Sequence, residues 1–164
     1  MTVLIRRAEL SESADVHRTM IAAFEPFRGK LVPPSGAHDE SVEDVRAAMN
    51  RGGALLALQD GTAVGSVRFE AHPDHLHVGR LSVIPAAQGQ GIGAALLRAV
   101  EDIAIQQSIP EITLFVRLVL DENLRFYARL GYRSERVEDH PSGLSKVVLM
   151  AKTLSLPGTP DRHE

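Results

Sequence analysis

Three glycines between a predicted strand and a predicted helix constrain this chain more than any other feature. Residues 75–84 have the pattern of a strand, and residues 91–107 repeat apolar side chains at helical spacing. Gly89, Gly91 and Gly93 lie at the junction. Without side chains in the way, N–H groups at the positive end of a helix dipole attract anions. The sequence therefore predicts a strand–turn–helix unit that holds a phosphate group.

Two well-known phosphate-binding motifs do not fit this turn. A Walker A loop ends in Gly-Lys-Ser/Thr, whereas Gly93 is followed by Ala94 and Ala95. A dinucleotide-binding fingerprint needs Gly-x-Gly-x-x-Gly, whereas the glycines here occupy alternate positions. A glycine-rich turn without any ligand stays open as an alternative.

The order of the predicted elements indicates the fold class. Asp60 and Gly61 are the strongest hairpin signal in the chain, and the Pro- and Gly-rich residues 25–40 form a long loop of a kind that is usually functional. The order β-α-α-β-β-β-α-β-α-β-β predicts an α/β fold, with one mixed twisted sheet of about seven strands and helices on both faces. The strands are predicted at residues 2–7, 54–58, 63–69, 75–84, 112–116, 132–137 and 144–150, and the helices at residues 13–24, 41–50, 91–107 and 121–129.

Length and composition exclude several classes of protein. At 164 residues the chain has the size of one domain, and we expect it to cover residues 1–152, followed by a flexible C-terminal tail at residues 153–164. The net charge of −3 and the 4% of aromatic residues argue against nucleic-acid binding. The absence of cysteine excludes disulfides and thiolate chemistry. Because no signal-peptide pattern and no run of ~20 apolar residues is present, we expect a cytoplasmic protein that does not associate with membranes.

Two motifs, in this order, resemble those of the GNAT superfamily of N-acetyltransferases. Residues 81–93 contain Leu-Ser-Val-Ile-Pro followed by Gln-Gly-Gln-Gly-Ile-Gly, similar to the family pattern Leu-x-Val-x-Pro and Gln/Arg-x-x-Gly-x-Gly/Ala. Residues 123–132 read Asn-Leu-Arg-Phe-Tyr-Ala-Arg-Leu-Gly-Tyr, similar to the family helix that ends in Phe-Tyr-x-x-Leu-Gly-Phe/Tyr. The match is strong over residues 79–132, and the predicted element order agrees with the family fold over residues 1–152.

The resemblance implies a single GNAT-like domain that transfers the acetyl group of acetyl-CoA directly to an amine in a ternary complex. It implies that the pyrophosphate of acetyl-CoA lies on the N–H groups of residues 88–94. The pantetheine would run beside residues 81–83, where two parallel strands separate, and the Val83 backbone would help to polarise the thioester carbonyl. The implied cofactor-binding residues are Leu81, Ser82, Val83, Gln88, Gly89, Gln90, Gly91, Ile92, Gly93, Ala94, Asn123, Phe126 and Tyr127.

Acetyl transfer needs a proton donor for the leaving CoA thiolate and a proton acceptor for the attacking amine. The resemblance implies that Tyr127 is the donor. Asn123 lies four residues earlier on the same helix face, although the commoner family pattern has its asparagine at the position that Leu120 occupies here. Glu70, His75 and His77 are candidates for the general base, and water or backbone groups are the alternative.

Other interpretations stay open beside this one. The segment 72–77, which holds His72, Asp74, His75 and His77, could be a metal site, but no further ligand follows by spacing and we expect no metal. A sensor or pseudoenzyme that binds CoA without transferring acetyl is the rival from another class. Tyr127 and its neighbour could also be packing residues of an amphipathic helix.

The acceptor is an amine of a small molecule or a peptide, and the fold does not decide which one. Residues 25–40 and 138–144 are expected to form the walls of its site. Arg80 and Arg117 flank the cofactor strands and either bind an acidic group of the acceptor or are solvated strand ends. The sequence also leaves open whether the protein is a monomer or a homodimer.

Overall fold

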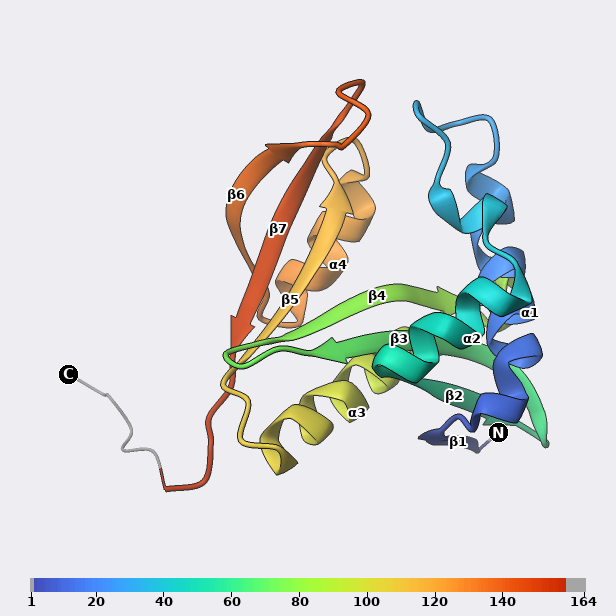
Figure 1. Cartoon of the computed structure of the whole chain (residues 1–164), viewed down its shortest axis with the longest axis vertical. Helices are drawn as coiled ribbons and strands as arrows, with labels where there is room; N and C mark the ends of the chain where they lie inside the picture. The colour runs from blue at the N-terminus through green and yellow to red at the C-terminus, as the bar shows by residue number, and fades with distance from the viewer. Residues whose placement is uncertain (1, 159–164) are drawn as a thin grey trace.

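Figure 1 shows the computed structural model of the chain, in which residues 2–158 are described. Within these residues a single seven-stranded sheet has the order β1-β2-β3-β4-β5-β7-β6. Only the pairing of β4 with β5 is parallel, and the other neighbours are antiparallel. The strands are β1 (Val3–Arg7), β2 (Gly53–Gln59), β3 (Thr62–Ala71), β4 (Leu76–Val83), β5 (Glu111–Arg117), β6 (Arg133–Asp139) and β7 (Lys146–Thr153).

Helices cover both faces of the sheet, as predicted. Figure 1 shows α1 and α2 together on one side of the molecule and α4 beside β5 on the other. Ser41 begins α2 through a capping box, in which its hydroxyl accepts a hydrogen bond from the Asp44 N–H at 3.1 Å. The α-helices are α1 (Ser13–Phe24), α2 (Val42–Arg51), α3 (Ile92–Gln106) and α4 (Asp121–Arg129), and short 3₁₀ turns lie at Leu10–Glu12, Glu25–Phe27, Gly36–Asp39 and Pro85–Ala87.

Two hydrophobic cores lie on opposite faces of the sheet because side chains alternate along each strand. In β2, Leu55 and Ala57 belong to the core that includes α3 and the apolar side of α4, whereas Ala54 and Leu56 belong to the core under α1 and α2. The predicted α/β order and the mixed sheet are confirmed. No helix in residues 2–158 is long and apolar enough to span a membrane.

A β-bulge bends β4 in its second half. Ser82 pairs with Ser66 and Gly79 pairs with Arg68, so Val67 between them faces two residues of β4. The extra residue is Arg80, which adopts a left-handed backbone conformation with φ of 54°. Such a bulge turns a strand away from its neighbour. The parallel pairing of β4 with β5 accordingly stops at Val78, and the two strands diverge beyond it.

The C-terminal strands differ in detail from the predicted boundaries. β6 and β7 both begin and end later than residues 132–137 and 144–150, because Tyr132 still belongs to the turn after α4, where its N–H donates to the Tyr127 carbonyl. After β7, Leu154 is only 9% exposed and its N–H donates to the Pro110 carbonyl. Contact with the core therefore continues to at least this residue. Residues 159–164 of the expected tail lie outside the described residues.

Candidate active site

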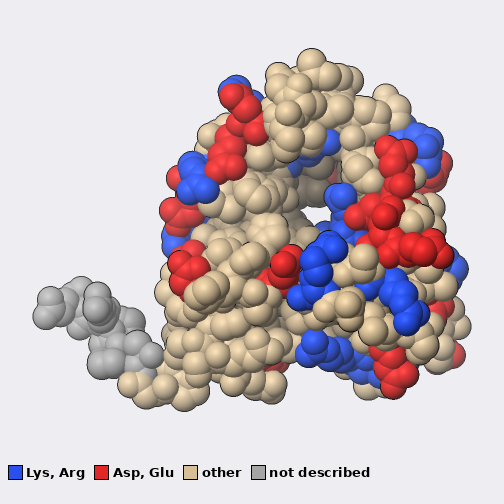
Figure 2. Space-filling view, viewed as in Figure 1, with Lys and Arg blue, Asp and Glu red and all other residues tan. Residues whose placement is uncertain are grey.

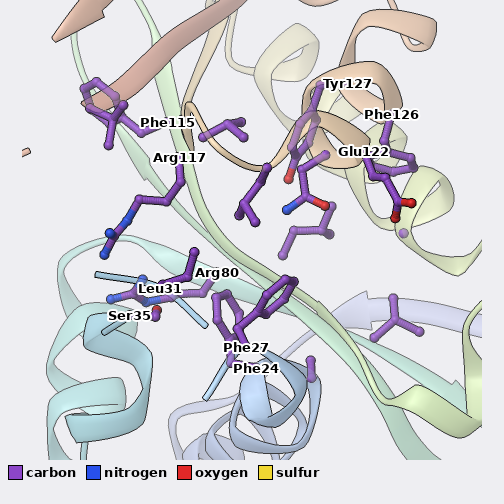
Figure 3. A pocket seen from close by; sticks show the side chains of 18 of the residues that line it. Phe24, Phe27, Leu31, Ser35, Arg80, Phe115, Arg117, Glu122, Phe126 and Tyr127 are labelled. Atoms are coloured by element: carbon purple, nitrogen blue, oxygen red, sulfur yellow. The ribbon is translucent and has the colours of Figure 1, made fainter. Parts of the chain in front are cut away.

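A cavity of about 1410 Å³ opens where β4 and β5 diverge. Its walls come from the end of α1 and the segment that follows it, from the second half of β4, from the glycine turn and the start of α3, and from β5, α4 and the β6–β7 connection. Figure 3 shows part of this lining. The volume exceeds the roughly 300–1,000 Å³ of a pocket for one small ligand, so the cavity has room for two.

The glycine turn forms one end of the cavity. Gly89 and Gly91 have φ of 80° and 79°, in the left-handed region that side chains disfavour. Gly91 is the N-cap of α3 and has no side chain to occupy the first N–H groups of the helix. An added Cβ at either glycine would meet no atom within 4 Å, so the turn is open on its outer side. The geometry is that of an anion site at a helix N-terminus.

The second half of β4 presents free backbone groups to the same cavity. The Ile84 N–H donates to the Val64 carbonyl of β3 at 2.9 Å. Because backbone groups alternate in direction along an antiparallel strand, those of Val83 point to the side from which β5 has separated. The Val83 carbonyl accepts a hydrogen bond from Gln88 Nε2 at 3.0 Å. The Val83 N–H therefore remains for a ligand that runs along this strand.

Most of the residues that the sequence assigned to acetyl-CoA meet at this cavity. Ser82 and Gln90 do not line it: Ser82 is buried and donates to the Arg80 carbonyl, and Gln90 accepts a hydrogen bond from Gln59 on the outer surface. The residues that line it are Leu81, Val83, Gln88, Gly89, Gly91, Ile92, Gly93, Ala94, Asn123, Phe126 and Tyr127.

Tyr127 lies in the cavity wall with its hydroxyl pointing inward (Figure 3). The rings of Phe126 and Tyr132 hold it, with centroids at 5.1 Å and 6.0 Å and edge-to-face geometry. Burial raises the pKa of the Tyr127 phenol to about 12, and the phenol makes no hydrogen bond with any described residue. The Tyr127 phenol is therefore protonated at neutral pH and faces the cavity.

Glu70 and His77 lie outside the cavity lining. They face each other across β3 and β4, at the end of β4 that is still paired with β5. His77 Nδ1 is 2.9 Å from Thr113 Oγ1, and burial lowers the pKa of its imidazole. Its ring packs against Phe115, which does line the cavity. The structure thus brings Tyr127 together with the glycine turn and leaves Glu70 and His77 outside the cavity lining.

Three titratable side chains at the β6–β7 side of the lining, Glu138, Asp139 and His140, already make contacts within the protein. Glu138 pairs with Arg136, and Asp139 pairs with Lys146 at 2.8 Å. His140 Nδ1 accepts a hydrogen bond from the Ser142 N–H, which leaves the proton of a neutral imidazole on Nε2. These contacts disfavour all three as the acceptor of a substrate proton. Among residues 2–158 there is no group of three or more His, Asp or Glu side chains placed to hold a metal ion.

The far end of the cavity is basic and apolar. Arg80 comes from the β4 bulge and Arg117 from the end of β5, and Figure 3 shows both on the side away from Phe126 and Glu122. Figure 2 shows basic side chains bordering the hollow on this face of the molecule. Of the expected acceptor walls, the segments 31–36 and 138–142 contribute lining residues. Phe27, within the expected segment 25–40, also lines this end, whereas sequence analysis missed Phe24, the last residue of α1.

Comparison with known proteins identifies the class. The sequence model of the acetyltransferase (GNAT) family matches residues 18–132, more than half of the chain. The chain therefore belongs to the GNAT family and is an acetyltransferase, which confirms the family and the enzyme class predicted from its two motifs.

Solved structures with the same fold come from several organisms. The PaiA N-acetyltransferase of Thermoplasma acidophilum in complex with coenzyme A has a TM-score of 0.79 at 21% identity, over 94% of this chain and 100% of that one. The ribosomal-protein-S18-alanine N-acetyltransferase of Escherichia coli has a TM-score of 0.78 at 17% identity, over 99% of each chain. A GNAT family acetyltransferase of Elizabethkingia anophelis with acetyl-CoA bound has a TM-score of 0.72 at 16% identity, over 93% of this chain and 98% of that one. At these identities the likeness concerns the fold.

Proposed function

We propose that this enzyme transfers the acetyl group of acetyl-CoA directly to the amine of a small acceptor while both substrates are bound. The observation that carries the proposal is one continuous cavity with two unlike ends and a phenol between them. The turn at Gln88 to Gly93 suits a pyrophosphate, and two structural neighbours hold coenzyme A or acetyl-CoA. The basic and apolar end, lined by Arg80 and Phe24, is left for the acceptor.

In this proposal the donor lies along the open edge of β4. Its pyrophosphate accepts hydrogen bonds from the N–H groups at the start of α3, and its pantetheine runs beside Leu81 and Val83. The free Val83 N–H polarises the thioester carbonyl and stabilises the oxyanion that develops during attack. The amine nitrogen bonds to the carbonyl carbon, and the carbon–sulfur bond then breaks.

Tyr127 donates its proton to the departing sulfur in this reaction. Its raised pKa keeps the phenol protonated at neutral pH, and its inward orientation aims the donor at the cavity. The proton that the attacking nitrogen loses restores the phenol, directly or through water. The products are an N-acetylated amine and CoA with a neutral thiol.

The acceptor amine must lose a proton before it attacks, and we assign this step to water. Glu70 and His77 lie outside the cavity lining. Glu138 and Asp139, which do line the cavity, are engaged in ion pairs. Positive charge on Arg80 and Arg117 favours the neutral form of an amine bound beside them. The surroundings therefore assist deprotonation without a dedicated base.

Initial-rate kinetics with a panel of amines test this proposal by following CoA release. Direct transfer predicts intersecting double-reciprocal lines, no CoA release without acceptor, and no acetylated protein in intact-mass spectra. Parallel lines together with an acetyl-enzyme would contradict direct transfer. Tight acetyl-CoA binding without release of CoA for any amine would instead support a sensor.

A further inference from the structure

Arg80 and Arg117 lie on the two strands that diverge around the cavity. Arg80 is the extra residue of the β4 bulge, in a left-handed backbone conformation that an arginine rarely adopts. Arg117 is the last residue of β5. Both line the acceptor end, on the side away from Phe126 (Figure 3), whose ring lies beside Gly93 of the glycine turn. They therefore lie too far along the cavity to serve the pyrophosphate.

The charges of this end do not balance within the protein. Glu40 accepts two hydrogen bonds from Arg68, each of 2.9 Å, and lies 3.4 Å from Arg80 Nε. One carboxylate thus faces two guanidinium groups. Arg117 bonds only to neutral partners in the described part of the chain, the Ser145 hydroxyl at 3.2 Å and the Pro34 carbonyl at 3.4 Å. The acceptor end therefore has surplus positive charge.

Burial makes this surplus costly. The Arg80 side chain is 30% exposed, and its Nε is buried without a hydrogen bond in the described residues. Burial lowers the pKa of both Arg80 and Arg117, and for Arg117 the charge of Arg80 adds to the effect. Both groups nevertheless stay charged. A bound anion would compensate the charge that the protein leaves unpaired.

The remaining surface of this end is apolar. The apolar side chains that line it are Phe24, Phe27, Leu31, Pro33, Pro34 and Phe115. The Phe24 ring also lies against the Arg80 guanidinium, with 5.9 Å from the ring centroid to Cζ. A ligand that fits this end combines an anionic group with an apolar body.

We infer that Arg80 and Arg117 bind the carboxylate of the acceptor, and that the acceptor is an amino acid with an apolar side chain. The inference rests on the transferase function proposed above, which supplies the need for an amine. An α-amino acid carries its amine and its carboxylate on one carbon. Anchoring the carboxylate at the arginines therefore holds the amine beside them, and the apolar side chain takes the space between the phenylalanines.

Matched acceptors test the inference by turnover. L-Leucine, L-methionine and L-phenylalanine are compared with their amides, which keep the amine and the side chain but lose the negative charge. We expect kcat/KM to be about 10- to 100-fold higher for the acids, the range of a charge-assisted contact. Equal or faster acetylation of the amides would overturn the inference and leave the transferase function standing.

Arg117→Gln tests the assigned residue, with Arg98→Gln on the exposed face of α3 as the matched control. We expect Arg117→Gln to remove the preference for acids over amides, and the ratio of the two kcat/KM values is the readout because loss of the Arg117 charge affects the deprotonation of both amines. Arg117→Lys keeps the charge but not the paired donors, so its preference should be intermediate. An unchanged ratio in a folded Arg117→Gln protein would contradict the inference.

Binding of a product analogue gives a readout that does not depend on catalysis. Calorimetry compares N-acetyl-L-phenylalanine with N-acetyl-L-phenylalaninamide on the CoA-loaded protein and on the protein alone. Tighter binding of the acid, lost in Arg117→Gln, supports the arginine site even where no turnover is seen. Equal affinity for the two ligands overturns it. Failure of the proposed function has a different signature, which is absence of acetyl-CoA binding or of acetyl transfer to any amine.

Discussion

Gln88 Nε2 donates a hydrogen bond to the backbone carbonyl of Val83 at 3.0 Å. This contact ties the glycine turn to the open edge of β4, so the two parts of the proposed donor site are held in one arrangement. It also satisfies the carbonyl that the departure of β5 leaves free. The Val83 N–H is then the group that a thioester carbonyl can meet in the proposed donor site.

Replacing Gln88 with alanine should weaken acetyl-CoA binding by removing this link. We expect a dissociation constant about 2- to 10-fold higher, in line with the net value of one hydrogen bond. Isothermal titration calorimetry measures the change, and Gln107→Ala at the exposed C-terminal end of α3 is the control. Equal affinities for the two variants would show that the link does not organise the turn.

Gly91→Glu should abolish acetyl-CoA binding, because it brings a carboxylate to the N–H groups assigned to the pyrophosphate. Gly61→Glu is a closely matched control: both glycines have φ of 79° and no atom within 4 Å of an added Cβ. The two variants should lose similar stability in urea, because the backbone strain is the same. Wild-type acetyl-CoA affinity in a folded Gly91→Glu protein would remove the turn from the donor site.

Glu40→Gln should destabilise the fold by about 1–3 kcal/mol, because it leaves Arg68 and Arg80 without their shared carboxylate. Burial opposes the charge of Glu40, but the hydrogen bonds and charge of Arg68 and then the charge of Arg80 outweigh it and lower the pKa of this carboxyl. A lowered pKa contributes stability above the unfolded value and loses it as the pH falls.

Urea unfolding at several pH values checks this prediction. The gap in unfolding free energy between wild type and Glu40→Gln should be full at neutral pH and should close as the pH drops below about 4.5. Asp39→Asn, an exposed carboxyl one residue away, is the control and should change little. A gap that stays constant with pH would mean that the charge of Glu40 contributes nothing.

Strand periodicity contains a signal for the β4 bulge, which lies where β4 begins to diverge from β5. Leu76 and Val78 occupy even positions and are buried, whereas the next apolar residues, Leu81 and Val83, occupy odd positions yet pack on the same core. One inserted residue explains the change of parity. The element order and the glycine turn followed from local patterns, which act over a few residues. The acceptor end did not follow from such patterns, because it brings together residues that are far apart in the sequence. Arg117, for example, donates a hydrogen bond to the carbonyl of Pro34.

Glu70 and His77 illustrate the same limit. The sequence places Glu70 near the end of one strand and His77 on the next strand, but it gives no position along the diverging strands. Their pairing at the closed end of β4 depends on where the bulge lies and where the contact with β5 stops. Tyr127 was easier to place, because the resemblance of residues 123–132 to the GNAT helix motif implied its position beside the cofactor.

The pH dependence of acetyl transfer should show no loss of a proton donor in the usual range of tyrosine. With a pKa of about 12, Tyr127 keeps its proton while the acceptor amine is deprotonated. Single-turnover rates should therefore rise with pH to a plateau and show no falling limb below about pH 11. A decline that begins near pH 9 or 10 in a folded enzyme would mean that a donor of ordinary pKa controls the step.

Tyr127→Phe removes the phenol and keeps the ring that packs between Phe126 and Tyr132. Folding and acetyl-CoA affinity should survive, because the hydroxyl makes no hydrogen bond with the described residues. The chemical step should slow by about 10²- to 10⁴-fold, the range for a lost general acid.

Single-turnover transfer to the best acceptor is the measurement for this variant, because product release can mask a slower chemical step in kcat. The loss should appear in the rate at saturating substrates and not in acetyl-CoA affinity, since the proton is needed only as the carbon–sulfur bond breaks. Phe126→Leu, which alters packing on the same helix but no proton donor, is the comparison. If the Tyr127→Phe enzyme transfers acetyl as fast as wild type, Tyr127 is a packing residue and the leaving thiolate takes its proton from water.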